Sequence, residues 1–239
     1  MSTTRPLVAI PGRFSASASA LRYGAVVTAR ALSQAILAAG GEPLAVHPAA
    51  PGGRVTTQEV ADRLAFADAV LLPGGGDIEP RRYGEVTASD HVYDVDEEQD
   101  GFDLVVARWA LDTGIPLLAV CRGLHIVVVA QGGRLEQDMA EPHRNVVNDV
   151  SVASGSLLDS IVGARLSVSC YHHQRVAELG AGLHATAWAT DGGVEAIEAD
   201  APTGWFLGIQ WHPEDSFDHD PSQQAIFSRL VAAARAPER

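Results

Sequence analysis

Apolar runs of four or five residues alternate with longer amphipathic segments along the first half of the chain. Turn-forming residues separate the two kinds of segment, as at Pro51-Gly52-Gly53 and Gly132-Gly133. Strands that alternate with helices form a parallel sheet with helices on both of its faces. The predicted strands are residues 7–10, 43–46, 69–72 and 116–120, and the predicted helices are residues 23–39, 57–66, 96–111 and 123–131.

The second half of the chain has shorter strands, separated by turn signals such as Asp191-Gly192-Gly193. We expect these strands to be antiparallel additions to the same sheet, followed by a closing helix. No internal repeat or low-complexity linker marks a boundary, so the sequence predicts one α/β domain over residues 1–239. The predicted strands are residues 145–152, 165–169, 183–190, 194–198 and 205–211, and the closing helix is residues 222–234.

The composition excludes several classes of protein. The chain has 239 residues, 46% of them hydrophobic, which is enough for the core of one sizeable domain. All 17 basic residues are arginine, so a Walker lysine, a Schiff-base lysine and a kinase-type lysine are excluded. The formal net charge of −13 argues against a nucleic-acid partner, because such partners need a basic face.

The two cysteines, Cys121 and Cys170, are too few for a disulfide framework, which favours a reducing compartment. The apolar run near the N-terminus is shorter than the roughly 7–15 residues of a signal peptide. No apolar run reaches the about 20 residues of a membrane span. We therefore predict a cytoplasmic protein with no membrane contact.

A hydrophobic strand turns sharply into a helix at residues 116–125, with Cys121 at the bend. Ala119 and Gly123, two residues before and after the cysteine, are small enough to let the strand and helix backbones approach. The thiol is then expected at a solvent-facing bend, where the positive end of the helix favours the thiolate. This pattern predicts a nucleophile elbow, and the alternative is a buried structural cysteine.

A cysteine nucleophile needs a base, which need not be close in sequence. The predicted strand at 205–211 ends at His212, and Pro213 and Glu214 follow. Glu214 is near enough to accept the imidazole N–H and to select the tautomer. His212 is thus a candidate base with Glu214 as its partner, although a lone histidine there would also suit the core.

Acyl transfer also needs hydrogen-bond donors for the developing oxyanion. The loop Pro73-Gly74-Gly75-Gly76-Asp77 follows a predicted strand and can present bare backbone N–H groups. The N–H groups of Gly75 and of Arg122, directly after the cysteine, are the candidate donors. By itself, a triple glycine would equally suit a flexible turn or a phosphate loop.

Five motifs follow one another over nearly the whole chain. They are residues 72–80 with 83–84, 120–124 with 132–133, 171–174, 191–192 with 194–198, and 208–214. In this order they resemble class I glutamine amidotransferases, and most closely the peptidase C26 branch of γ-glutamyl hydrolases, which includes γ-glutamyl-γ-aminobutyrate hydrolases. The resemblance implies a flavodoxin-like, three-layer α/β/α sandwich, a thioester mechanism and the triad Cys121, His212 and Glu214.

The chain departs from the family's pattern outside the triad. Ala119 stands where a glycine usually opens the elbow, and His125 and Val128 stand where glutamine and asparagine are usual. Cys170 replaces a usual serine, and Gln99 replaces a usual arginine. Hydrolysis is still expected, whereas the identity of the substrate depends on such positions.

The adjacent histidines His172 and His173 invite a metal assignment. Neighbouring side chains on an extended segment point in opposite directions, so we expect no metal site here. The resemblance suggests instead that one of the two histidines helps to shape the substrate pocket. Glu195 is either a solvated strand residue or the acceptor of the substrate's α-ammonium group. The candidate substrate-binding residues are Gly74, Gly76, His172, His173, Gln174 and Glu195.

Ten acidic residues lie between Asp77 and Asp103 against only Arg81 and Arg82, a local balance of −8. Such a run is usually a solvated loop and helix start. Because it follows the predicted oxyanion loop, it is alternatively a lid that attracts cationic leaving groups.

These patterns together predict a cysteine-dependent hydrolase of γ-glutamyl amides, with a γ-glutamyl-γ-aminobutyrate-type substrate. His212 would take the Cys121 proton, the thiolate would attack the γ-carbonyl, and water would hydrolyse the thioester. The expected partner is a small γ-glutamyl molecule, no cofactor is needed, and a homodimer is left open. The alternatives are a glutaminase subunit that passes ammonia to a separate synthetase and a non-catalytic binding module on the same fold.

Overall fold

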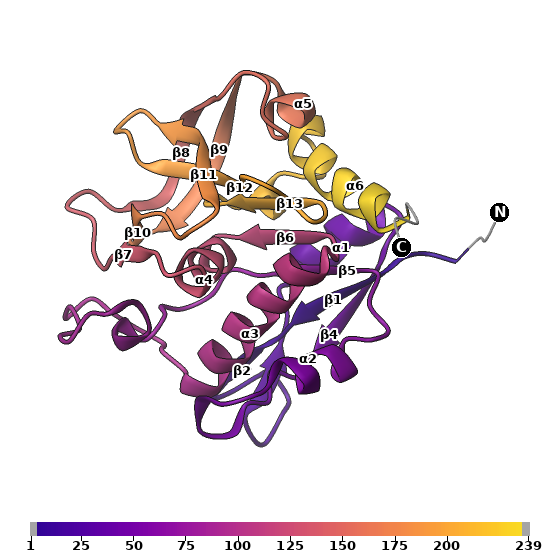
Figure 1. Cartoon of the computed structure of the whole chain (residues 1–239), viewed down its shortest axis with the longest axis vertical. Helices are drawn as coiled ribbons and strands as arrows, with labels where there is room; N and C mark the ends of the chain where they lie inside the picture. The colour runs from indigo at the N-terminus through magenta and orange to yellow at the C-terminus, as the bar shows by residue number, and fades with distance from the viewer. Residues whose placement is uncertain (1–3, 236–239) are drawn as a thin grey trace.

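The computed structural model describes residues 4–235, and a nine-stranded mixed sheet forms its centre (Figure 1). The strand order is β4-β1-β5-β6-β13-β12-β11-β8-β9. The first five strands of this order are parallel, and each of the last four is antiparallel to the strand before it in the order. The strands are Leu7–Pro11 (β1), Glu42–Val46 (β4), Ala69–Leu72 (β5), Leu117–Val120 (β6), His143–Val152 (β8), Arg165–His172 (β9), Leu183–Ala189 (β11), Val194–Ala199 (β12) and Phe206–Ile209 (β13).

Helices cover both faces of the sheet because its central strands are apolar on both sides. In β1, Ala9 joins the core under α2, α3 and α4, whereas Val8 and Ile10 join the core under α1 and α6. The predicted three-layer α/β/α sandwich is confirmed. The helices are Arg30–Ala38 (α1), Thr57–Arg63 (α2), Glu97–Thr113 (α3), Arg122–Ala130 (α4), Asp159–Val162 (α5) and Pro221–Arg235 (α6).

The long helix α3 owes its start and its end to local sequence. The Asp96 side chain accepts a hydrogen bond from the Gln99 N–H at 2.9 Å, and acidic residues fill the first turn. Gly114 ends the helix with a φ of 73°. Within residues 4–235, no helix is both long enough and apolar enough to cross a membrane.

The predicted helix at residues 23–39 is wrong in its first part. Ala25–Val27 (β3) pairs antiparallel with Arg13–Ser15 (β2), and α1 begins only at Arg30. The β-branched Val26 and Val27 favour an extended backbone. Val26 also packs so closely on Gly12 that a Cβ at Gly12 would lie 2.4 Å from its Cγ1.

A second small sheet and three short 3₁₀ helices complete the fold: Arg134–Glu136 (β7) with Arg175–Glu178 (β10), and Pro51–Gly53 (η1), Pro80–Tyr83 (η2) and Pro213–Asp215 (η3).

The strand β13 also differs from the expectation that every strand of the second half is an antiparallel addition. It pairs parallel with β6, residue Phe206 opposite Leu117 and Ile209 opposite Val120, and antiparallel with β12. All four residues of each strand are buried, which is typical of parallel strands covered on both faces. The chain segments that follow β6 and β13 therefore leave the sheet side by side.

Candidate active site

Cys121 lies between the end of β6 and the start of α4, with φ 51° and ψ −109°. A positive φ is unfavourable for a residue with a Cβ and is often found at active sites. The Cys121 N–H donates to the Ile209 carbonyl at 2.7 Å, which ties the bend to β13. The predicted elbow geometry is present, but the expected solvent-facing thiol is wrong, because Cys121 is only 6% exposed.

The small residues around the elbow allow close packing, as the sequence indicates. A Cβ at Gly123 would lie 2.3 Å from the Leu72 carbonyl oxygen, so α4 crosses the end of β5 in backbone contact. Ala119 is fully buried and pairs with Leu72 on β5 and with Gly208 on β13. Three strands and one helix thereby hold the cysteine.

His212 lies just beyond the end of β13, where its backbone N–H donates to the Ser169 carbonyl at 2.9 Å. Its Nδ1 lies 2.8 Å from Glu214 Oε1, and both side chains are mostly buried. The carboxylate accepts the Nδ1–H, which leaves Nε2 as the nitrogen that can exchange a proton. Within the described residues, His212 Nε2 has no hydrogen bond of normal geometry. It is nevertheless close enough to Cys121 for the charges of the imidazole and the thiol to affect one another.

Burial lowers the pKa of His212, but the charge and hydrogen bonding of Cys121 and Glu214 outweigh this effect and raise the pKa to about 11. The imidazole is therefore protonated at neutral pH when the neighbouring thiol is ionised. A thiolate beside an imidazolium is the reactive form of a nucleophilic cysteine. The structure thus brings together Cys121, His212 and Glu214, as the sequence predicts.

The three glycines after β5 each contact a different group. A Cβ at Gly74 would lie 2.9 Å from His212 Cε1 and 3.6 Å from Cys121 Cβ, so this glycine borders the reactive atoms. At Gly75 a Cβ would lie 2.8 Å from the Arg13 side chain, and at Gly76 it would lie 2.6 Å from the Asp94 carbonyl. A side chain at Gly76 would collide with backbone and one at Gly74 with the His212 ring, whereas one at Gly75 would require the Arg13 side chain to move.

Two residues connected to the thiol by hydrogen bonds, one directly and one through the other, were not among the sequence candidates. Gln210 donates from Nε2 to Cys121 Sγ at 3.8 Å, and its Oε1 lies 2.7 Å from His125 Nε2. Burial lowers the pKa of His125 to about 4, so the ring is neutral and donates its Nε2–H to Gln210. Gln210 lies in the motif at residues 208–214. Within that motif, only the histidine and the glutamate are recognisable from sequence as a base and its partner, so Gln210 was missed.

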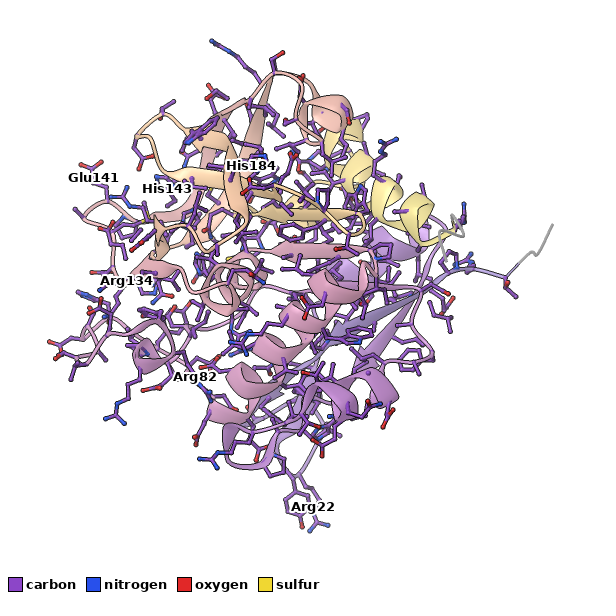
Figure 2. All side chains as sticks on the ribbon, in the orientation of Figure 1. Arg22, Arg82, Arg134, Glu141, His143 and His184 are labelled. Atoms are coloured by element: carbon purple, nitrogen blue, oxygen red, sulfur yellow. The ribbon has the colours of Figure 1, made fainter. Side chains whose placement is uncertain are left out.

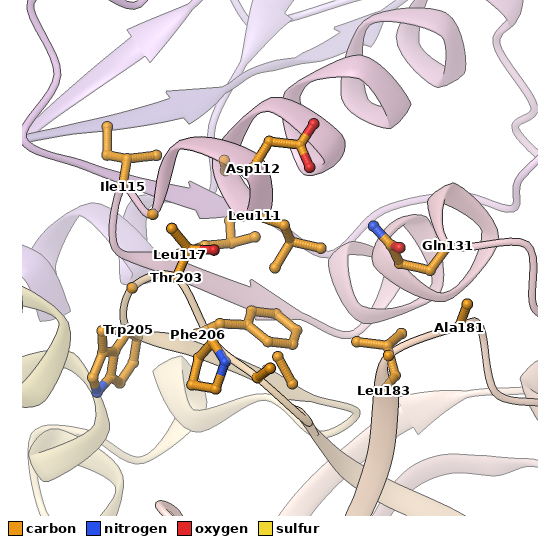
Figure 3. A pocket seen from close by; sticks show the side chains of 17 residues that line it. Leu111, Asp112, Ile115, Leu117, Gln131, Ala181, Leu183, Thr203, Trp205 and Phe206 are labelled. Carbon is orange, nitrogen blue, oxygen red and sulfur yellow. The ribbon is translucent and has the colours of Figure 1, made fainter.

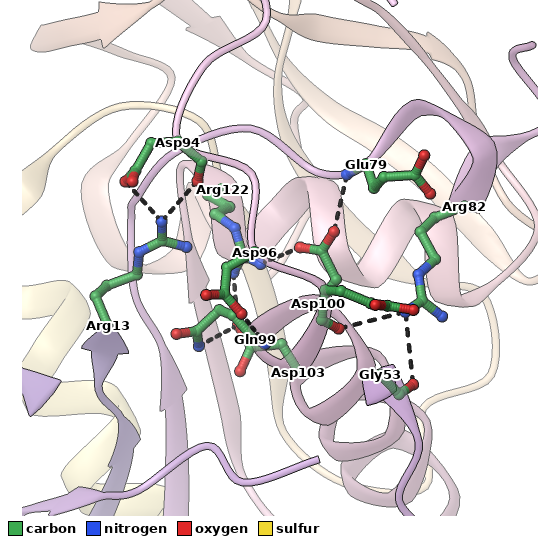
Figure 4. Close-up of polar contacts among 11 residues, drawn as sticks. Arg13, Gly53, Glu79, Arg82, Asp94, Asp96, Gln99, Asp100, Asp103 and Arg122 are labelled. Atoms are coloured by element: carbon green, nitrogen blue, oxygen red, sulfur yellow. Dashed lines mark hydrogen bonds and ion pairs between the residues drawn. The ribbon is translucent and has the colours of Figure 1, made fainter. Parts of the chain in front are cut away.

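The Arg122 side chain, by contrast, forms a buried ion pair with two carboxylates of α3 (Figure 4). It donates to Asp103 at 2.5 Å and to Asp100 at 2.7 Å, and both carboxylates are fully buried. These contacts attach the first turn of α4 to α3. The expectation of a solvated acidic helix start is therefore wrong for Asp100 and Asp103.

We expect Arg122→Met to lower the free energy of unfolding by about 3–5 kcal/mol, because it leaves two buried carboxylates without their cation. Urea denaturation followed by circular dichroism measures the loss. Arg134→Met is the matched control, since Arg134 pairs with Glu85 at the surface and should lose less than about 1 kcal/mol. Equal losses in the two variants would contradict a stabilising role for the buried pair.

The segment after the glycine loop folds back over that loop. The Asp77 N–H donates to the Tyr93 carbonyl, and the Tyr93 N–H donates to Asp77 Oδ2, both at 3.0 Å. Asp94 accepts a hydrogen bond from Arg13 at 2.9 Å beside Gly75 (Figure 4). The segment thus has the position of a lid, but Asp77, Asp94, Asp100 and Asp103 are each partnered by a basic side chain.

Arg13 is a further residue that sequence reasoning missed. Its side chain is only 13% exposed, and its Nη1 is buried without a hydrogen-bond partner in the described part of the chain. Burial lowers its pKa, as does the nearby Arg122, but the guanidinium remains a cation. The glycine loop is therefore bordered by the Arg13–Asp94 ion pair, whose cation has one nitrogen without a hydrogen bond among the described residues.

The predicted substrate-binding residues divide into two groups. His173 faces Asp77 and Asp138, with 3.0 Å between each ring nitrogen and a carboxylate oxygen. His172 instead donates from Nδ1 to the Gln174 carbonyl at 2.9 Å, and its Nε2 faces Glu195 at 3.7 Å. Glu195 is 1% exposed, so its interpretation as a solvated strand residue is wrong.

A pocket of about 200 Å³ lies elsewhere, lined by Leu117, Trp205 and Phe206 among others (Figure 3). Leu117 and Phe206 begin β6 and β13, whereas Cys121 and His212 follow the ends of the same strands. The pocket therefore lies at the N-terminal ends of these two strands, whereas the thiol lies at their C-terminal ends. It does not belong to the candidate active site.

The profile of the family described as Peptidase C26 matches residues 6–214. A Mycobacterium tuberculosis protein provisionally named a glutamine amidotransferase is 34% identical over 213 residues. That match covers 84% of this chain and 65% of the relative, so the chain spans about two thirds of the relative's length.

The γ-glutamyl-γ-aminobutyrate hydrolase of Escherichia coli K12 is 29% identical over 221 residues, which is 84% of each protein. The structure also resembles a Thermoplasma acidophilum protein provisionally named as part of a GMP synthase, with a TM-score of 0.67 and 15% identity. The alignment covers 97% of this chain and 94% of the other. At this identity the likeness concerns the fold.

Proposed function

Because the chain belongs to the peptidase C26 family of class I glutamine amidotransferase-like hydrolases, we propose that it hydrolyses γ-glutamyl amides through a thioester on Cys121. The observation that carries the proposal is the arrangement of three groups at the end of β6 and β13. Cys121 occupies a strand-to-helix bend with positive φ, and the Glu214 carboxylate holds His212 with Nε2 free for proton transfer. This is the arrangement that nucleophilic acyl transfer requires.

In the first half-reaction, the Cys121 thiolate attacks the γ-carbonyl carbon, and the carbonyl oxygen becomes an oxyanion. The backbone N–H groups of Gly75 and Arg122 are the proposed donors to that oxygen. The C–N bond then breaks, and the leaving amine takes the proton from His212 Nε2. In the second half-reaction, His212 removes a proton from water, the hydroxide attacks the thioester, and the thiolate is released.

Gln210 acts in this proposal as a positioning residue. Its amide is held by the neutral His125 at one end and donates toward the sulfur at the other. A neutral donor can hold the thiolate in place without neutralising it, as a second cation would. The glutamine-to-histidine departure at position 125 thus bears on the orientation of the nucleophile.

The charge around the glycine loop favours a leaving amine that carries a carboxylate. Arg13 pairs with Asp94 through Nη2, and its Nη1, beside Gly75, has no hydrogen-bond partner within residues 4–235 and is available to a carboxylate. A γ-glutamyl-γ-aminobutyrate-type substrate has such a carboxylate on its leaving group. The acidic composition suggested a cationic leaving group as the alternative, but such a group would be repelled by the Arg13 guanidinium.

The test compares three substrates that differ in the charge of the leaving group: γ-glutamyl-γ-aminobutyrate, glutamine and a mono-γ-glutamyl diamine. We expect the highest kcat/KM for the anionic leaving group, and a loss of about 10- to 100-fold for that substrate alone in Arg13→Gln. Arg22→Gln is the matched control, because Arg22 is exposed at the far end of the β2–β3 hairpin (Figure 2).

The other outcomes distinguish the alternatives. The highest kcat/KM for glutamine, unchanged in Arg13→Gln, would favour a glutaminase subunit. The absence of hydrolysis with all three substrates would favour a non-catalytic binding module. A γ-glutamyl adduct on the Cys121 peptide, detected by mass spectrometry after rapid acid quench, would support the thioester directly.

A further inference from the structure

Four side chains able to bind a metal ion converge beside the candidate active site: His143, Cys170, His172 and Glu195. One possible ligand atom from each lies within 4.8 Å of the others. Cys170 and His172 are two residues apart on β9 and therefore face the same side of the sheet. His143 on β8 is directly opposite His172, and Glu195 comes from β12.

One ring nitrogen of each histidine faces this cluster, and for His172 a hydrogen bond fixes which nitrogen carries the proton. The Gln174 carbonyl can only accept, so His172 Nδ1 carries the proton and Nε2 faces Glu195 Oε1 at 3.7 Å. On His143, Nε2 lies 3.5 Å from Asp191 Oδ2, and Nδ1 faces the same Glu195 oxygen at 3.7 Å. A carbonyl or carboxylate behind the ring is the usual support of a metal-binding histidine.

Three buried polar atoms of these residues have no full hydrogen bond. They are His143 Nδ1, His172 Nε2 and Glu195 Oε2, counted within residues 4–235. Glu195 is 1% exposed and the His172 side chain is 4% exposed, so bulk water does not supply the missing partners. A buried carboxylate that faces two imidazoles is unfavourable unless a positive group lies beside it, which is either a protonated imidazole or a bound metal ion.

We propose that these four residues bind a divalent transition-metal ion with the ligand preference of Zn²⁺. Two imidazoles, one thiolate and one carboxylate form a four-ligand set that suits tetrahedral zinc, whose ligand atoms are about 3.3–3.8 Å apart. Small side-chain movements bring the cluster to that size. Cys170 releases its proton to solvent when the metal–sulfur bond forms.

The bound ion would join β8, β9 and β12, and it takes no part in the hydrolysis proposed for Cys121. The expectation of no metal considered His172 and His173 as a pair. In the fold, His173 faces Asp77 and Asp138 instead, and the partners of His172 come from three separate stretches of the chain. Cys170, which stands where the family usually has serine, supplies the thiol.

The test uses Co²⁺ as a spectroscopic probe in the Cys121→Ser protein, where Cys170 is the one remaining thiol. Chelator-treated protein is titrated with Co²⁺ and then with Zn²⁺. We expect one equivalent of Co²⁺, visible bands of tetrahedral cobalt and a thiolate-to-cobalt charge-transfer band, all abolished by Zn²⁺. Because this protein lacks the nucleophile, the result does not depend on the proposed hydrolase activity.

Three further substitutions in the same background locate the site. Cys170→Ser should lose the charge-transfer band and bind Co²⁺ at least about 100-fold more weakly, and Asp191→Asn should bind about 10- to 100-fold more weakly. His184→Ala is the matched control and should bind unchanged, because His184 is on β11 and pairs with the exposed Asp200 (Figure 2). Circular dichroism verifies that each variant is folded.

Two outcomes would overturn the proposal. The first is a charge-transfer band that persists in Cys170→Ser, which would place the ion elsewhere. The second is no Co²⁺ binding by the parent. In that case, a higher KM for γ-glutamyl substrates on introducing Glu195→Gln into the Cys121-containing protein would identify the cluster as an ammonium subsite.

Discussion

Cys121→Ala and Cys121→Ser are expected to lower kcat for γ-glutamyl substrates by at least about 10⁴-fold while the protein remains folded. The reaction has no other route to the thioester, since the sulfur is the atom that bonds to the γ-carbonyl carbon. The fold should survive because the β6–α4 bend is held by backbone contacts to Ile209 and Leu72 and not by the thiol. Steady-state kinetics and thermal melting monitored by circular dichroism measure the two effects.

Alkylation distinguishes Cys121 from the second thiol. Burial raises the pKa of Cys170 to about 12, and its side chain is fully buried, so iodoacetamide should modify Cys121 first. Peptide mapping by mass spectrometry identifies the site, and inactivation should follow its modification. Inactivation that tracks modification of Cys170 would contradict the assignment of the nucleophile.

His212→Ala should lower kcat about as much as loss of the cysteine, whereas Glu214→Gln should retain roughly 100 times more activity than His212→Ala. Without His212 there is no base for the thiol and no acid for the leaving amine. A glutamine at 214 can still accept the Nδ1–H, but the lost carboxylate charge lowers the pKa of His212. Parallel measurement of kcat in the two variants tests this order.

Asp215→Asn is the matched control for Glu214→Gln. Asp215 is the next residue along η3, but its carboxylate accepts a hydrogen bond from Ser169 and does not contact His212. This variant should keep nearly the parent kcat. If His212→Ala and Glu214→Gln lose activity equally, Glu214 does more than orient the imidazole.

Much of the fold could be predicted from sequence because its strands and helices are locally encoded. The apolar run at 69–72 corresponds to β5, and the amphipathic pattern at 96–111 predicts α3 to within two residues at each end. The prediction failed at residues 23–29, where an amphipathic pattern continues into a hairpin. There, Val26 and Val27 pair with β2, and this long-range pairing overrides the helical pattern.

Neighbours in the chain were enough to predict the elbow at Cys121 and the pairing of His212 with Glu214. The elbow depends on small residues around a bend, and the pairing depends on a carboxylate two residues from an imidazole. The parallel position of β13 beside β6 could not be predicted, because hydrophobic periodicity describes each strand's faces but not its lateral neighbours. That strand order brings His212 to Cys121.

The remaining partners meet only in the folded chain. Arg13 meets the glycine loop from β2, His125 reaches the thiol through Gln210, and Glu195 meets His172 from a different strand. Each pair is distant in sequence, and no local pattern indicates it. A buried polar group acquires its partner from whichever strands and loops pack around it, so its chemistry becomes visible only when the sheet order is known.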